Sequence, residues 1–297
     1  MVLIKEAPGK HIYKLSILLF LFVTTITCQN HGKLSLVHSL PDTLEEISGF
    51  SSAEGSPLLW SVNDSGNEAI VYGYNPITNK IERTIEITNG ENEDWEDVTS
   101  DDDGNIYIGD FGNNRNKRED QVIYQLTTRH ELPKVAMEAI KISFQFEDQD
   151  KFPPKKKNRN FDVESFVYLD GNFYLFTRNR SSKFDGTTKL YKLPAQPGHH
   201  TAMLMDTFVT CEDDDDCQVT SAAIDRKQNR LVLLSYNKVW LFSNYPADNF
   251  FKGSVRLIKL NHTSQKESIS FRDENSLFIA DEENGSGGRN LYILELD

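Results

Sequence analysis

Cysteine and histidine are scarce in this chain, and basic residues are outnumbered by acidic ones. Three cysteines and seven histidines occur among 297 residues, and the two adjacent histidines, His199 and His200, follow a Pro-Gly turn. This leaves no cluster of soft ligands, which argues against a zinc site. Lysine and arginine total 32 against 45 aspartates and glutamates, a formal charge of -13. The deficit argues against a nucleic-acid partner, because phosphate binding requires a basic face.

The motifs of common catalytic folds are also absent. The sequence contains no G-x-S-x-G, no G-x-G-x-x-G and no P-loop pattern. It therefore gives no support to an α/β-hydrolase nucleophile or a nucleotide cradle. The mean hydropathy of -0.51 excludes a polytopic membrane protein.

The N-terminus has the pattern of an export signal. A lysine-containing stretch precedes the apolar run LSILLFLFVTTI at residues 15–26. The run is shorter than the ~20 residues of a membrane span but fits a secretory signal. Cys28 follows at once, as in bacterial lipoproteins, although Thr27 replaces the usual Gly, Ala or Ser. We expect a lipoprotein-type signal peptide at 1–27, lipidation of Cys28, a tether at 28–32 and anchoring in the cell envelope. Plain cleavage, giving a secreted or periplasmic protein, is the alternative.

The other two cysteines flank four aspartates in the segment CEDDDDCQ. An exported compartment permits disulfides, so we expect Cys211 and Cys217 to be bonded and to close a small surface loop. A calcium site in this loop is the alternative, but the segment lacks the glycine and the alternating ligands of a calcium loop.

A repeated opening organises the rest of the chain. Its spacing of about 50 to 70 residues is that of propeller blades. Each opening is followed by a turn rich in Gly, Asn, Asp or Ser and by further short apolar runs, which indicates antiparallel strands. The five openings are EISGFSS at Glu46, EDVTSDD at Glu96, ESFVYLD at Glu164, TSAAIDR at Thr220 and ESISFRD at Glu267.

This repeat predicts an all-β fold, a single β-propeller of four-stranded blades over residues 33–297. Five blades fit the repeat, and six are the alternative. The fifth unit reaches the C-terminus after three strands. We therefore expect the N-terminal segment KLSLVHSL, residues 33–40, to pair with that unit, close the ring and protect its edges. Two stacked sandwiches would not explain five similar openings.

Two sets of polar residues should surround one mouth of the propeller channel, because the starts of first strands and the ends of second strands share a face. Glutamates crowded there must raise their pKa values, pair with cations or bind a metal, for which Ca²⁺ is suited. The alternative is that each glutamate holds neighbouring blades together through hydrogen bonds. The expected ligand-binding residues are Glu46, Asp64, Glu96, Asp110, Glu164, Arg178, Tyr236, Glu267 and Asp281.

The expected mouth is asymmetric. In the fourth unit Thr220 and Tyr236 replace acidic residues, and in the third Arg178 does so. Such variation suits an unsymmetrical ligand. Basic stretches at 115–118 and 151–159 should reach the same face, where they could hold an anionic group beside a metal; solvated loops are the alternative.

Several segments together resemble the β-propeller lipoproteins of Bacteroidetes-type bacteria: WSVNDSGN, DWEDVTSDDDGNIYIGDFGNNRN and LFIADEENGSGG. The resemblance covers nearly the whole mature chain and implies a fold and a location rather than an activity. A more distant resemblance is to the regucalcin- and gluconolactonase-like hydrolases and the phytase-like propellers, which place Ca²⁺ on acidic and amide side chains in the channel. Carried over to this sequence, that likeness implies Ca²⁺ ligands at Glu46, Asp64, Glu96, Asp110 and Asp281.

Three functions follow from these patterns. The first is a cell-envelope propeller that binds a ligand at its acidic mouth, with Ca²⁺ as the candidate cofactor. The second is a metal-dependent hydrolase of esters, lactones or phosphoesters, with Glu164 as the candidate base. The third is a non-catalytic scaffold for a protein partner. We expect a monomer without a nucleic-acid partner, and the sequence leaves open whether it is an enzyme.

Overall fold

Short β-strands make up most of the chain. A computed structural model describes Val2 and residues 30–53, 56–127, 135–214, 216–285 and 287–296. The predicted signal peptide and the lipidation predicted at Cys28 lie outside these residues. From His31 onward the chain forms one unit.

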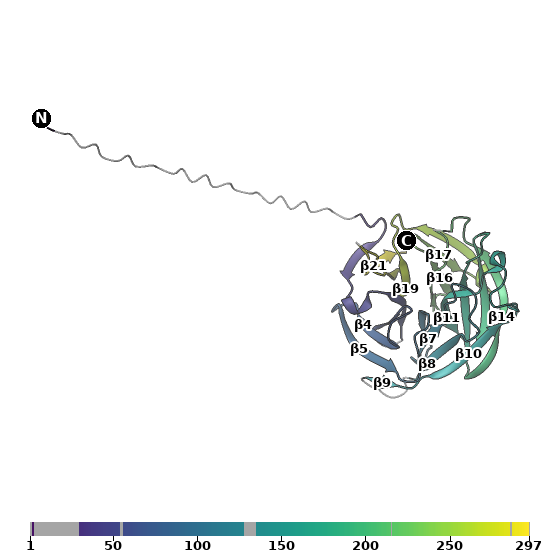
Figure 1. The fold of residues 1–297 in the computed structure, drawn as a ribbon. Helices are drawn as coiled ribbons and strands as arrows, with labels where there is room; N and C mark the ends of the chain where they lie inside the picture. Colours follow the sequence, from purple (N-terminus) through teal and green to yellow (C-terminus); the bar gives the residue numbers. More distant parts are fainter. Residues whose placement is uncertain are drawn as a thin grey trace. The chain divides into compact units, whose positions relative to one another are not determined.

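The described strands form four hydrogen-bonded sheets (Figure 1). The first has the order β2 (Ile47–Ser52), β3 (Leu59–Asn63), β4 (Ile70–Asn75), β5 (Lys80–Ile87) and β9 (Ala136–Met137). The second contains β6 (Trp95–Ser100), β7 (Ile106–Asp110), β8 (Val122–Leu126) and β10 (Ile140–Phe146), followed by β14 (Gly198–Val209), β13 (Thr187–Pro194), β12 (Asn172–Arg178) and β11 (Asp162–Leu169). Its two antiparallel halves are joined by the parallel pair β10 and β14.

The remaining two sheets have four strands each. One has the order β15 (Ser221–Asp225), β16 (Arg230–Leu234), β17 (Lys238–Ser243) and β18 (Ser254–Lys259). The other has the order β19 (Lys266–Asp273), β20 (Ser276–Asp281), β21 (Asn290–Glu295) and β1 (Ser35–Ser39). The N-terminal segment thus pairs with the last strand, as expected, with Ser39 opposite Asn290.

The strands that follow the repeated openings lie at the centre. β2 contacts β6, β6 contacts β11, β11 contacts β15, β15 contacts β19, and β19 contacts β2. All six residues of β6 are buried, whereas β5 and β18 are largely exposed. Sheets that radiate from a closed cycle of inner strands define a β-propeller.

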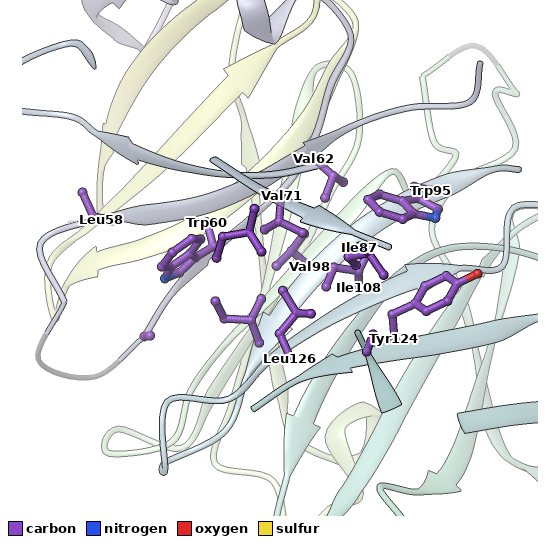
Figure 2. Close-up of a cluster of buried hydrophobic side chains, with 14 of the residues drawn as sticks. Leu58, Trp60, Val62, Val71, Ile87, Trp95, Val98, Ile108, Tyr124 and Leu126 are labelled. Carbon is purple, nitrogen blue, oxygen red and sulfur yellow. The ribbon is translucent and has the colours of Figure 1, made fainter. Parts of the chain in front are cut away.

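The sheets are held to one another by clusters of buried hydrophobic side chains. Figure 2 shows the cluster in which Trp60, Val71 and Ile87 of the first sheet meet Trp95 and Ile108 of the next. Tight hairpins link the strands within sheets: Asp170 and Gly171, both at positive φ, turn β11 into β12, as the sequence Asp-Gly favours. A further cluster joins Leu40 and Leu44 to Leu291, so the packing also runs between the two ends of the described chain.

Three short 3-10 helices complete the description: η1 (Asp42–Leu44), η2 (Lys156–Asn158) and η3 (Phe250–Lys252). No helix within the described ranges has the length and apolarity needed to cross a membrane. Cys211 and Cys217, the expected pair, are bonded in a disulfide.

We predict that the strand β1 is required for stability. A chain starting at Pro41 loses the buried Leu34 and Leu40 and exposes the edge of β21. Each lost leucine should cost roughly 2–5 kcal/mol, and the open edge should promote aggregation. A chain starting at Gln29 is the control. Thermal unfolding and light scattering would be measured on both chains. Equal unfolding midpoints and equal aggregation of the two chains would refute this requirement.

Candidate functional site

A polar cavity of about 230 Å³ opens where the inner strands begin. It contains six of the nine side chains expected at the mouth, and they come from five parts of the chain far apart in sequence. The lining residues are Ile47, Ser48, Asp64, Glu96, Asn114, Glu164, Arg178, Arg180, Tyr236, Gln265, Glu267 and Glu282.

The repeated glutamates reach this cavity from β-bulges. The register of β6 against β7 shifts between Trp95 and Asp97, that of β11 between Val163 and Ser165, and that of β19 between Lys266 and Ser268. In each case the skipped residue is a glutamate of the repeat. A bulge leaves one residue outside the ladder and redirects its side chain, which explains how Glu96, Glu164 and Glu267 all face the cavity.

Three of the expected residues do not line the cavity. Glu46 is exposed, and its carboxylate accepts a hydrogen bond from Asn67. Asp110 forms a 2.8 Å ion pair with Arg118. Asp281 is fully buried and accepts hydrogen bonds from Ser264 and Tyr292. These contacts occupy the carboxylates of Asp110 and Asp281, so the expected set of ligands changes.

Four acidic or basic residues of the site were not in the expected set. Arg180 and Glu282 line the cavity, and Asp94 and Asp162 lie directly behind Glu96 and Glu164. A period-two search would have found three of them, because Asp94, Asp162 and Arg180 stand two positions from Glu96, Glu164 and Arg178. In an extended strand, residues two apart share a face.

Two arginines hold one side of the cavity together. Arg178 donates to Glu164 at 3.1 Å and to the hydroxyl of Tyr236 at 3.1 Å, and its nearest atom lies 3.9 Å from Glu267. Arg180 donates to Asp162 at 2.5 Å and to Glu164 at 2.8 Å. The nearby carboxylates raise the pKa of both guanidinium groups. Both oxygens of Glu164 are therefore paired with cations.

The opposite side has carboxylates without such partners. Among the described residues, no donor forms a hydrogen bond with the carboxylate of Glu96, although only 6 % of this residue is exposed. The glycine at position 112 gives it room: a Cβ there would lie 2.1 Å from Glu96 Oε1 and 2.5 Å from Asp94.

Carboxylate oxygens meet in two groups of three that share Glu96. One is Asp64, Asp94 and Glu96, the other Glu96, Asp162 and Glu164, and the oxygens of each group lie within 4.8 Å of one another. All are hard oxygen ligands of the kind that Ca²⁺ and Mg²⁺ prefer. The geometry of each group could hold a cation.

Burial and mutual repulsion raise the pKa values of these acids. Burial raises the pKa of Asp64 to about 6 and that of Asp94 to about 7. It raises that of Asp162 to about 7 and, helped by Asp64 and Glu46, that of Glu282 to about 8. Burial first, and neighbouring carboxylates second, put the pKa of Glu96 well above its usual range. Without a cation, protonation of these carboxylates is therefore favoured, because it removes the charge that burial and mutual repulsion disfavour.

Asp97, the residue after Glu96, links β6 to β11. It is fully buried, and its two oxygens accept backbone N–H groups of Val98 at 2.9 Å and of Phe166 at 3.1 Å. The sequence left open that the repeated glutamates hold neighbouring blades together through hydrogen bonds. In β6 this role belongs to Asp97 and not to the glutamate before it.

Comparisons with known proteins give a fold-level likeness only. No family model and no curated protein matches the sequence. A PQQ-bound aldose sugar dehydrogenase from Streptomyces coelicolor aligns at 10% identity over 89% of this chain and 98% of its own, with a TM-score of 0.49. A gluconolactonase from Xanthomonas campestris aligns at 12% identity over 89% of both chains, with a TM-score of 0.47. The β-propeller domain of Cps50 (Swd1) from Myceliophteria thermophila aligns at 8% identity over 89% of this chain and 100% of its own, with a TM-score of 0.44. Similarities this low transfer no activity.

We predict that the cation-free protein loses stability as the pH rises. The raised pKa values mean that the folded state binds more protons than the unfolded state between about pH 5 and pH 8, so the free energy of unfolding falls through that range. Glu282→Gln should flatten the upper part of the decline, whereas Glu274→Gln at the opposite mouth should not. Urea unfolding with chelator across this range tests both; a stability that rises towards pH 8 would contradict the assignment.

Proposed function

We propose that this chain is a five-bladed β-propeller of the cell envelope that binds a divalent cation, best Ca²⁺, in its acidic cavity. The proposal rests on the carboxylate of Glu96. This residue is buried, its carboxylate has no hydrogen-bond donor among the described residues, and it belongs to both carboxylate groups. Burying an ionised carboxylate without a partner is costly. A cation at this point would remove that cost.

The group formed by Asp64, Asp94 and Glu96 is the better place for the ion. Asp162 and Glu164 already bind Arg180, whereas no ion pair involves Asp64, Asp94 or Glu96 in the described part of the chain. Three carboxylates without sulfur or imidazole favour Ca²⁺ over zinc. This set keeps Asp64 and Glu96 from the sequence-based ligands, adds Asp94, and leaves out Glu46, Asp110 and Asp281.

The cation would give the cavity an affinity for an anionic small molecule. Arg178, Arg180 and Tyr236 line the same cavity as Asp64 and Glu96, and each guanidinium has five N–H donors. A carboxylate or phosphate could complete the coordination of the ion and accept hydrogen bonds from these residues.

Hydrolysis is the weaker alternative. The proposed base, Glu164, has both oxygens paired with arginine, which leaves it poorly placed to accept a proton from water. The binding function does not need a free base, and the geometry supports it better. A scaffold role is weakened because the carboxylate of Glu96 forms no hydrogen bond or ion pair within the described residues, although Glu267 lies 3.9 Å from Arg178 of another sheet.

The five-blade count is supported by the cycle of five inner strands and by the five buried hydrophobic clusters among the described residues. Export is supported by the Cys211–Cys217 disulfide, because disulfides persist in oxidising compartments.

We predict that Ca²⁺ raises the midpoint of thermal unfolding and that Glu96→Gln abolishes the rise. A ligand at 100 times its Kd stabilises the folded state by about 2.7 kcal/mol. Glu46→Gln is the control: Glu46 was a ligand in the sequence-based set, and this variant should keep the calcium response. Thermal unfolding would be measured on the chain from Gln29, with Ca²⁺ and with chelator. An absent calcium shift, or a shift retained in Glu96→Gln, would overturn the cation site.

We predict that Cys28→Ala releases the mature protein from the membrane. The full chain, expressed in a bacterium with the lipoprotein pathway, should incorporate an acyl label and partition into detergent. The variant should do neither. Equal partitioning of both proteins into the aqueous phase would support plain secretion instead.

A further inference from the structure

The second carboxylate group already holds a positive charge supplied by the protein. Its members are Glu96, Asp162 and Glu164. The guanidinium of Arg180 lies 2.5 Å from Asp162 Oδ2 through Nε and 2.8 Å from Glu164 Oε1 through Nη2. It therefore contacts two of the three acids that would have to bind a metal ion in this group.

The acids around Arg180 are strongly desolvated. Asp162 and Glu164 are 0% and 3% exposed in their side chains, while Arg180 is 24% exposed. The other oxygen of Asp162 accepts the backbone N–H of Asn113, and the other oxygen of Glu164 accepts Arg178. Removing the guanidinium would leave two buried carboxylates whose remaining partners cannot balance both charges.

We propose that Arg180 is a resident cation that fills the second carboxylate group, so that the cavity admits one exogenous divalent cation rather than two. The shared residue, Glu96, then lies between the bound ion and the guanidinium. An arginine suits this place because it stays protonated in proteins and bonds two carboxylates through its planar fork. The position of the first ion rests on the function proposed above, but the role of Arg180 does not.

The alternative is a two-metal site bridged by Glu96, an arrangement typical of enzymes that hydrolyse phosphoesters. In that case Arg180 would have to leave Asp162 and Glu164 when the second ion binds. The two arrangements differ in the number of bound ions, which can be counted directly.

The test is the stoichiometry of Ca²⁺ on the chain from Gln29, measured by native mass spectrometry and by isothermal titration. We expect one Ca²⁺ on the wild type and two on Arg180→Met, which keeps an unbranched apolar stem but removes the guanidinium and its charge. Arg226→Met is the matched control, because this arginine pairs with Asp102 at the opposite mouth. It should bind one ion, and so should Arg180→Met combined with Asp162→Asn.

The outcomes separate the two proposals. Two ions on the wild type, or the same number of ions on the wild type and on a folded Arg180→Met, would overturn the resident-cation role. No ion on the wild type but one on Arg180→Met would refute the proposed calcium function and support the role of Arg180. If Arg180→Met does not fold without calcium, Arg180→Gln, which can still bond Asp162, provides the same count. Circular dichroism before titration checks that each variant is folded.

Discussion

Repulsion among buried carboxylates is the constraint on which the rest of the site depends. Asp64, Glu96, Glu164, Glu267 and Glu282 line a cavity of about 230 Å³, where their charges are poorly screened. The protein meets this cost on one side only, where Arg178 and Arg180 pair with the acids. On the other side the cost remains, and the raised pKa values are its measure. A positive charge placed among these carboxylates would reduce that cost.

The inner strands make this crowding possible. Each cavity glutamate of β6, β11 and β19 occupies a bulge, so its side chain leaves the ladder without breaking the sheet. Asp97, bound by two backbone N–H groups, links β6 to β11, and buried hydrophobic clusters join neighbouring sheets.

The asymmetry of the ring gives the site its direction. The third unit contributes both arginines and the fourth contributes Tyr236, while the first and second contribute Asp64, Asp94 and Glu96. A cation on one wall and donors on the other suit a small anionic ligand better than a symmetric ring would. Binding explains this arrangement without requiring a free base, whereas the base proposed for hydrolysis, Glu164, is paired with Arg178 and Arg180.

The sequence by itself determined the all-β class, the repeat, the pairing of residues 33–40 with the last strand and the general place of the acidic mouth, because spacing and alternation are local properties. Only the tertiary structure decided which acids meet. Asp110 and Asp281 end the second strands β7 and β20 as Asn63 ends β3, one residue before Asp64, and Arg118, Ser264 and Tyr292 engage their carboxylates. Asp94, Asp162 and Arg180 stand two positions from Glu96, Glu164 and Arg178, but only the fold shows which carboxylates and arginines meet. Contacts between distant segments set these partners, and no single stretch of sequence contains them.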